Sequence, residues 1–501
     1  MSIDLTLDRV RLLASHLPQF KRLTCHIAGT NGKGSVSSIL SSILHSVFTV
    51  GRYNSPHLVS IYDCITINNK PISPATYAAA RKEVEEANDR FDTKASSFEL
   101  LTLTALLIFE RAKLDVVVIE VGLGGRLDAT NIIPDDAILV SALASVDLDH
   151  QAFLGSTVEA IAKEKAGIAR KDKPFVMGVQ KHAGVEQVVR STVSDVGGDF
   201  ISGQAVQTRP WDESIDGPES RTFSLSAEPF KKPPAQPISF NIPVYLSDIL
   251  ALFPLHGRHQ LDNLGLALSV VSTILTHPSC RKAIAFHIRC EFTMDTIARG
   301  IASTSWPGRL SFHTIGPGAV SSHFQQITRP LHTLVDGAHN PASSAALGSY
   351  VSDLVSLATR SQAADSQTQA VIRLTYVLSL SDSPPKTPKE TLTPLFDIKH
   401  PAGSSLQLNV AVLRFTPPEG MPWVKSVSPA LLRDTICAVA PGVEVWCAGD
   451  DEDPRSGSLV RALAWAAGRG EGNDVQELVI VAGSLYLVAD FYRLLGAGTT
   501  V

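Results

Sequence analysis

Short runs of apolar residues alternate along the chain with segments of helical periodicity. The runs at 23–28, 115–121 and 137–146 are nearly continuous, as in strands buried on both faces of a parallel sheet. Helix-competent segments with many apolar residues lie between them, at 36–47 and 98–112. Strands that alternate with helices predict a doubly wound α/β sheet, in which ligands bind beyond the carboxyl ends of the strands.

A second set of strands and helices follows the segment Trp306-Pro307-Gly308-Arg309. We expect strands at 333–335, 373–379, 410–415, 443–446 and 478–481, and helices at 341–359 and 486–495. Residues 191–243 are rich in Pro, Ser and Gly and predict an irregular surface insert. The pattern therefore predicts a first domain over residues 1–309 and a second α/β domain over 310–501. Polar stretches at 360–369 and 381–389 are typical of linkers.

The first apolar run leads into a glycine-rich loop, GTNGKGS, at residues 29–35. Glycines let several N–H groups point at one place, and the following helix adds its positive N-terminal end. Lys33 adds a full charge. The spacing departs from the general phosphate-loop pattern, because Gly34 separates Lys33 from Ser35. We interpret the loop as a site for nucleotide phosphates, and a glycine-rich turn without a ligand is the alternative.

Polar side chains also follow the next two apolar runs. Glu120 stands near the end of the run 115–121, and Asp147, Asp149 and His150 follow the run 137–146. Buried charges are paired or bound to metal, whereas a carboxylate at an exposed strand end needs neither. The strand ends share one edge with the glycine-rich loop, which favours a Mg²⁺ site beside phosphates. A histidine ligand would be unusual for that ion.

One lysine falls on the apolar face of an expected helix at 157–169. Lys165 follows Ile161 by four residues and so lies on the same helix face. Ser156 and Glu159 form a capping-box pattern at the start of this helix. A lysine in this position either extends its amine to solvent or serves a site through a shifted pKa or a covalent modification.

The segment from Asp336 to Pro341, DGAHNP, follows the first strand of the second domain. One interpretation is a simple helix start, with Asn340 as the cap and Pro341 at the first helical position. In the other, Asp336 holds a ribose or base at the domain interface. Arg309, just before this domain, is placed to reach a phosphate.

Composition narrows the function classes. The 501 residues carry a net charge of −5, which gives no electrostatic footprint for nucleic acid. No apolar run reaches the roughly 18 residues of a membrane span, and the N-terminus does not have the pattern of a secretory signal. The six cysteines lack metal spacing and favour a reduced, cytoplasmic protein.

Several motifs together resemble one family. HIAGTNGKGS, NSPHL, SFELLT, EVGLGGRLDATN, LDHQAFLG, EKAGI, GRHQLDN, WPGR and DGAHN occur in the order found in the folylpolyglutamate synthase/dihydrofolate synthase family of Mur-ligase-like enzymes. The resemblance spans roughly residues 5–495 apart from the two inserts. It implies a P-loop-type doubly wound domain followed by a Rossmann-like domain. Within the family, the chain is most similar to fungal monofunctional dihydrofolate synthases, because eukaryotic polyglutamate synthases tend to carry Lys where Asn31 stands.

The resemblance implies ATP-dependent ligation of L-glutamate to 7,8-dihydropteroate through an acyl phosphate. The alternative is a folylpolyglutamate synthase, or a bifunctional enzyme, that extends the glutamate tail of folates. A third hypothesis, a nucleotide-binding regulatory protein without ligase activity, is disfavoured by the intact motif residues. The resemblance further implies Mg²⁺, small-molecule substrates only, a monomer, and a cytoplasmic location with a mitochondrial pool left open.

The resemblance also assigns roles residue by residue. The ATP contacts are Gly32, Lys33, Gly34, Ser35, Asn263, Arg309 and Asp336. The Mg²⁺ ligands are Ser55, Glu120, His150 and Lys165, the last as a carbamylated lysine. The pterin contacts are Arg126, Leu127, Asp128, Ser96 and Phe98. The residues expected to be catalytic are Lys33, Lys165 and His150.

Overall fold

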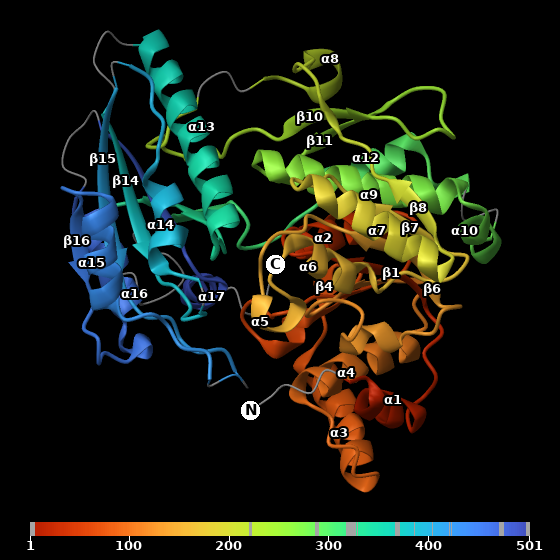
Figure 1. Cartoon of the computed structure of the whole chain (residues 1–501). Coiled ribbons are helices and arrows are strands. Elements are labelled where there is room, and N and C mark those ends of the chain that lie inside the picture. Colours follow the sequence, from red (N-terminus) through yellow and green to blue (C-terminus); the bar gives the residue numbers. More distant parts are fainter. Residues whose placement is uncertain are drawn as a thin grey trace.

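The computed structural model has two lobes, each built around its own sheet (Figure 1). It describes residues 6–219, 223–285, 290–316, 327, 329–365, 371–384, 386–402, 404–419, 421, 423–469 and 475–496. The first lobe contains an eight-stranded and a three-stranded sheet, and the second lobe a six-stranded sheet. The α/β class predicted from the alternating pattern is confirmed.

The large sheet of the first lobe has the strand order β4-β3-β2-β5-β1-β6-β7-β8. Its strands are β1 (Leu23–Ala28), β2 (Val50–Tyr53), β3 (Ile65–Ile67), β4 (Lys70–Pro71), β5 (Val116–Glu120), β6 (Ile138–Leu143), β7 (Pro174–Met177) and β8 (Asp199–Ser202). The pairs β2-β5, β5-β1, β1-β6, β6-β7 and β7-β8 are parallel, whereas β3 and β4 form an antiparallel edge beside β2. Strands β5 and β6 are buried throughout, which explains their continuous apolar runs.

Helices cover both faces of this sheet. On one face, Val116 and Val118 of β5 share an apolar core with residues of α2, α9 and α12, and on the other face Val117 and Ile119 share a core with residues of α1, α3 and α4. Helices α6 and α7 cover the part of the sheet nearest β7. The helices are α1 (Asp8–Ser15), α2 (Lys33–His45), α3 (Pro74–Arg90), α4 (Ser97–Arg111), α5 (Gln151–Leu154), α6 (Val158–Ala166), α7 (Ala183–Val196), α9 (Arg258–Thr276), α10 (Pro278–Ala283) and α12 (Met294–Ala302).

The range 191–243 is only partly irregular. It holds the end of α7, all of β8, and the elements β9 (Gln207–Thr208), α8 (Glu213–Asp216) and β10 (Gln236–Phe240). β10 pairs with β9 and with β11 (Ile249–Phe253), and this small sheet packs in the core above α9 and α12. These short strands pair with partners outside the predicted insert or across its loops, so that no local pattern marked them.

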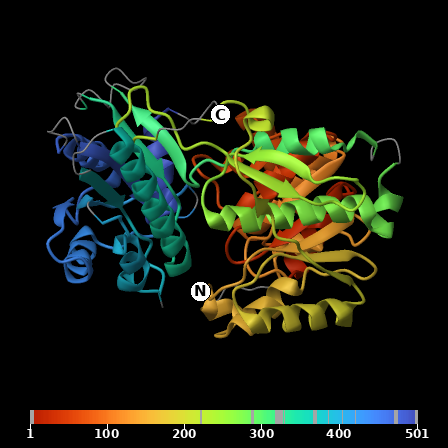
Figure 2. The same ribbon diagram turned by 90° about the horizontal axis from the view of Figure 1, so that it is seen from above.

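Residues 223–230 of that range lie against the second lobe, contrary to the predicted assignment of 191–243 to the first domain (Figures 1 and 2). The backbone N–H of Leu225 donates to the side chain of Gln476 over 3.0 Å, and the Ser226 hydroxyl donates to the Val475 carbonyl over 3.2 Å. The ring of Phe230 stacks on His332 at 4.5 Å. Residues 223–230 therefore pack on the second lobe, although the residues on either side of them in the chain belong to the first lobe.

The second lobe is a sheet of order β12-β13-β17-β14-β15-β16, parallel except for β12. Its strands are β12 (Ser311–Ile315), β13 (Leu331–Val335), β14 (Val371–Leu378), β15 (Ser405–Val412), β16 (Glu444–Cys447) and β17 (Val475–Ala482). Its helices are α13 (Pro341–Asp365), α14 (Pro388–Phe396), α15 (Pro429–Val439), α16 (Ser458–Ala467) and α17 (Leu485–Leu494). Helices α13 to α15 cover one face, and α16 and α17 cover the other.

Both stretches predicted to be linkers are partly helical. Helix α13 continues through the first of them to Asp365, and α14 begins inside the second at Pro388. Residues 366–369 and 385 of these stretches lie outside the described residues. Within the part of the chain that the structure describes, no helix is both long and apolar enough to cross a membrane.

Candidate active site

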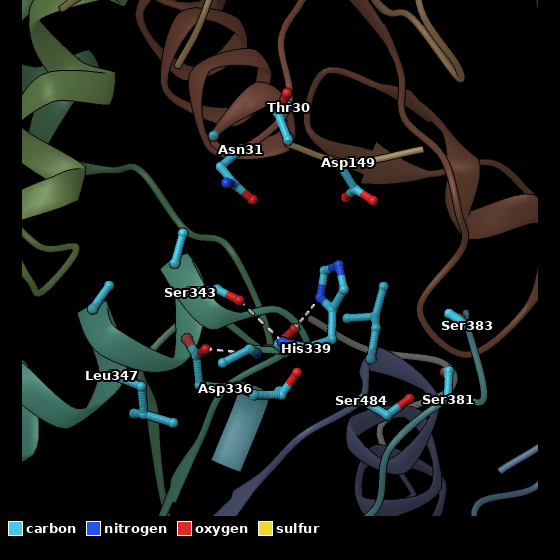
Figure 3. A pocket seen from close by; sticks show the side chains of 18 of the residues that line it. Thr30, Asn31, Asp149, Asp336, His339, Ser343, Leu347, Ser381, Ser383 and Ser484 are labelled. Carbon is cyan, nitrogen blue, oxygen red and sulfur yellow. Dashed lines mark hydrogen bonds between the residues drawn. The ribbon is translucent and has the colours of Figure 1, made fainter. Parts of the chain in front are cut away.

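A cavity of about 900 Å³ lies between the two lobes, and the carboxyl ends of β1, β5 and β13 open into it. In Figure 3, Thr30, Asn31 and Asp149 of the first lobe face Asp336, His339 and Ser343 of the second. Ten residues that the sequence assigned to ATP or magnesium line this cavity: Gly32, Lys33, Gly34, Ser35, Ser55, Glu120, His150, Asn263, Arg309 and Asp336.

The glycine-rich loop begins directly after β1 and ends in α2. Gly32 occupies the cap position of α2 with φ +89°, and a β-carbon there would lie 2.2 Å from Oδ1 of Asn263. Only glycine fits this place, and it has no side chain that could cap the first turn. The N–H groups of Thr30 and Asn31 both donate to the Ser145 carbonyl, at 2.8 and 3.2 Å. Because Gly32 provides no side-chain cap, the N–H groups in the first turn of α2 are available to an anion.

Glu120 ends β5 beside this loop and is only 5% exposed. Lys33 Nζ lies 3.8 Å from its Oε1, and the Asn54 amide donates to its Oε2 over 2.8 Å. Burial raises the pKa of Glu120, while Lys33 and the Asn54 hydrogen bond oppose that rise. Arg309, from the segment between the lobes, also acts on this carboxylate. A carboxylate stripped of water in this way is a strong oxygen ligand for a divalent cation.

Lys165 is buried beneath the glycine-rich loop, and its Nζ donates to the Gly29 carbonyl over 2.9 Å. Burial, assisted by the charge of Lys33, lowers the pKa of Lys165 to about 7. Its helix, α6, is capped by Thr157, whose hydroxyl accepts from the Ala160 N–H over 3.2 Å. The predicted capping box at Ser156 is therefore wrong by one residue, because the hydroxyl of Thr157 is the one that reaches the third N–H of the helix.

Asp149 and His150 sit at the edge of the cavity, where the two lobes touch. The His150 N–H donates to Asp149 Oδ1 over 2.8 Å, and Lys386 of the second lobe pairs with the same oxygen at 2.8 Å. Burial favours a higher pKa for Asp149, but His150 and Lys386 outweigh it and lower the value to about 2. Burial lowers the pKa of His150.

Lys386 was missed by the sequence reasoning, which treated its surroundings as a linker. No local signal marks it, since its partner lies far away in the sequence. Gln260 was missed for a similar reason: its amide donates to Ser35 Oγ over 3.2 Å and its Oε1 accepts from the Asn263 amide over 3.0 Å. Lys386 becomes part of the site only where the two lobes meet, and Gln260 only where α9 packs against α2 within the first lobe.

The loop after β13 closes the cavity from the second lobe. Asp336 accepts the N–H of Leu310 at Oδ2 over 2.9 Å and the N–H of Ala338 at Oδ1 over 2.8 Å. The Asn340 side chain caps α13 by accepting the Ser343 N–H over 2.9 Å, which confirms its predicted capping role. Its amide also donates across the cavity to Asn31 over 3.2 Å.

The residues predicted to contact a pterin are not among those lining this cavity. The Asp128 carboxylate accepts N–H groups of its own loop, from Leu123 at 2.8 Å and Thr130 at 3.0 Å. Arg126 pairs with Glu164 at 3.0 Å, Leu127 is half-buried, and Ser96 caps α4. Phe98 packs against Gly122, which does line the cavity, so this ring stands directly behind the wall. The pterin assignments stay a prediction.

The donor set fits a magnesium ion that arrives with a nucleotide. Among the described residues, no group of three or more His, Cys, Asp or Glu side chains is arranged to hold a metal. Protein sites for Mg²⁺ commonly supply one or two carboxylates and leave the other positions to phosphates and water. Glu120 with the Ser55 hydroxyl meets that description, since both line the cavity beside the glycine-rich loop.

Two α/β lobes with a phosphate-type loop facing a second-lobe carboxylate define a Mur ligase-like, ATP-dependent ligase, and comparison with known proteins supports this class. The family model "Dihydrofolate synthetase, C-terminal domain" matches residues 320–494. Dihydrofolate synthetase of Saccharomyces cerevisiae is 30% identical over 99% of this chain and 98% of its own length. The chain therefore belongs to the dihydrofolate synthase/folylpolyglutamate synthase family.

Solved structures agree with this assignment. Mycobacterium tuberculosis folylpolyglutamate synthase, complexed with ADP and AMPPCP, matches with a TM-score of 0.70 at 25% identity, over 98% of this chain and 95% of that chain. A bifunctional folylpolyglutamate synthase/dihydrofolate synthase with Mn, AMPPNP and L-glutamate bound matches with a TM-score of 0.65 at 25% identity, over 99% and 95%. The predicted two-domain fold class is confirmed.

Proposed function

We propose that this chain is a dihydrofolate synthase, which joins L-glutamate to 7,8-dihydropteroate and converts ATP to ADP and phosphate. The observation that carries the proposal is the cavity between the lobes, where the glycine-rich loop, Glu120 and Arg309 converge. Similarity over the full length to the dihydrofolate synthetase of Saccharomyces cerevisiae supports the choice of acceptor. Because both walls of the cavity come from one chain, we also propose that a monomer is active.

The chemistry needs two steps, because a carboxylate is a poor electrophile at neutral pH. The pteroate carboxylate attacks the γ-phosphorus of ATP, the bond to the bridging oxygen breaks, and ADP leaves. The α-amine of glutamate then attacks the acyl phosphate carbonyl, phosphate leaves with the bonding pair, and an amide remains after loss of the amine proton. Closure of the cavity by both lobes protects the acyl phosphate from water.

The chain's own residues supply charge and position. Lys33 and the uncapped start of α2 bind the phosphates, and Arg309 adds a second cation from between the lobes. Glu120, Ser55 and His150 would hold Mg²⁺, which when bound neutralises phosphate charge. Asn263, adjoining Gly32, would contact the nucleotide from α9.

Lys165 is proposed to carry a carbamate. A lysine held under the phosphate loop, in contact with the Gly29 carbonyl, has no solvent to keep its ammonium form charged. Its neutral amine would form a bond to the carbon of CO₂ and release a proton. The resulting anion would provide an oxygen ligand at the base of the glycine-rich loop, where the charges of Lys33 and Asp149 act on this side chain, and would explain why a lysine occupies a buried helix face.

The test is an assay of the purified chain with ATP, Mg²⁺ and L-glutamate, offering dihydropteroate or tetrahydrofolate side by side. We expect ADP release and a glutamylated product with dihydropteroate. Product from tetrahydrofolate alone would instead establish a folylpolyglutamate synthase, and product from both a bifunctional enzyme. Lys33→Ala is the control, and it should release no ADP with either acceptor.

A further inference from the structure

We propose that Asp336 is a positioning residue, which holds Leu310 in a left-handed backbone conformation and thereby fixes the direction in which Arg309 enters the cavity. The proposal rests on the proposed function only in that Arg309 meets the ATP phosphates. It gives Asp336 a role that does not require contact with the nucleotide.

Leu310 occupies an unusual backbone region for its residue type. Its φ is +47°, and among the described non-glycine residues with positive φ it is the one apolar side chain. A β-carbon in this region crowds the neighbouring carbonyl, so that leucine adopts it only where the surroundings enforce it. The Leu310 side chain is 2% exposed and belongs to the core of the second lobe, which anchors the residue in place.

Two hydrogen bonds enforce the conformation on either side of Arg309. The Leu310 N–H donates to Asp336 Oδ2 over 2.9 Å, and the Gly337 N–H donates to the Gly308 carbonyl over 2.9 Å. Asp336 is itself fixed at the end of β13, because its Oδ1 accepts the Ala338 N–H over 2.8 Å. The backbone that flanks Arg309 is thus attached to the loop after β13 at two points, one of which is the Asp336 carboxylate.

The direction of the Arg309 side chain needs this support, because the residue borders two open spaces. It lines the large cavity between the lobes and also a smaller cavity of about 240 Å³ behind the connection, together with Trp306 and Phe312. Its Nη1 donates to the Gly308 carbonyl over 3.0 Å and lies against Gly337, where a β-carbon would come within 2.3 Å. Rotation of the backbone at Leu310 would redirect the guanidinium relative to both spaces.

A set of paired variants separates this role from a direct ligand contact. Asp336→Asn places an amide where two carboxylate oxygens now accept N–H groups. It should weaken AMPPCP binding whether Asp336 positions Arg309 or contacts the nucleotide directly. In that background we compare Leu310→Gly with Leu310→Ala. Both remove the same buried side chain beyond the β-carbon, but only glycine adopts positive φ without steric cost. We expect the glycine double variant to bind AMPPCP about tenfold more tightly than the alanine one.

With Asp336 intact, the two substitutions at Leu310 should bind AMPPCP about equally, because the carboxylate already holds the backbone. Equal affinity of the two double variants would overturn the proposal and leave Asp336 as a nucleotide contact alone. Product assays with dihydropteroate do not enter this comparison, so failure of the proposed function would be seen separately, in the wild-type chain.

A second measurement keeps the proposal testable if the double variants fail to fold. Hydrogen exchange of the Leu310 amide, followed by mass spectrometry of the native chain and of Asp336→Asn, reads the hydrogen bond directly. Faster exchange in Asp336→Asn, together with weaker binding of AMPPCP, is the expected result. Unchanged protection of this amide would contradict the proposal, since Asp336 would then not be what holds it.

Discussion

The cavity is bordered by two loops of the same architecture, and they differ in how their helices begin. Each loop follows a buried parallel strand, β1 or β13, and each leads into a helix, α2 or α13. At α2 the cap position is Gly32, which offers the first turn no side-chain partner. At α13 the Asn340 side chain accepts the N–H of Ser343 over 2.9 Å.

The first loop can therefore bind a ligand through its backbone N–H groups, whereas the second loop can bind one mainly through its side chains. An uncapped helix start presents N–H groups and partial positive charge to an anion, whereas a capped one has spent part of that capacity internally. We therefore propose that the first loop binds the phosphates. The second loop contributes side chains, through Asp336 and Asn340, and sets the position of the segment between the lobes.

The largest loss of activity is expected from a substitution in the first loop. Gly32→Ala would place a β-carbon 2.2 Å from Asn263 Oδ1 at φ +89°. We expect kcat/KM for ATP to fall by about two to three orders of magnitude, as when groups that stabilise the transition-state charge are displaced. Gly337→Ala is the matched change in the second loop, where the obstructing atom is the flexible end of Arg309. A larger loss in Gly337→Ala, measured by ADP release, would reverse the comparison.

The next effect concerns the support beneath the first loop. Lys165→Met keeps an unbranched apolar chain in the buried site but removes the amine that contacts Gly29. We expect turnover to fall about a hundredfold, with no rescue by high bicarbonate, because no amine remains to be carbamylated. With ¹³C-bicarbonate, the native chain should show a carbamate carbon signal by NMR that the variant lacks. Near native turnover in Lys165→Met would remove the carbamate hypothesis.

A smaller effect tests the contact between the lobes. Lys386→Ala and Asp149→Asn each break the 2.8 Å ion pair, and we expect about a tenfold loss of kcat/KM from each, with the double variant losing less than their product. Additive losses would show that the two residues act independently. Since the folded pKa of Asp149 is lowered to about 2, its ion pair should contribute fully to the stability of the folded state above pH 4. That contribution should be lost only as the pH falls toward 2.

The smallest effect concerns the cap of the second loop. Asn340→Ala should lower the free energy of unfolding by about 1 kcal/mol, because the Ser343 N–H loses its partner. Asn340→Ser should restore most of that stability while still lacking the amide that donates to Asn31. Thermal unfolding of the three chains measures the cap. Their KM values for ATP measure the Asn31 contact, and unchanged melting of Asn340→Ala would contradict the capping role.

Elements could be predicted where local pattern and burial coincide. The run 115–121 became β5 (Val116–Glu120) because a strand buried on both faces leaves a continuous apolar sequence. Lys165 was conspicuous because a charge on an apolar helix face has few explanations. By contrast β9, with only the residues Gln207–Thr208, and the stretch 223–230 carry no periodic signal, and their partners lie far away in sequence.

The sequence by itself determined the glycine-rich loop, the buried strands that lead to Glu120 and His150, and the lysine on an apolar helix face, because each depends on residues close together in the chain. Only the tertiary structure decided what faces that loop from the second lobe. Asn340 meets Asn31 across 309 positions of sequence, and Lys386 meets Asp149 across 237. Such contacts depend on how the backbone turns between the lobes, at Gly308 and Leu310, and no local pattern encodes that geometry.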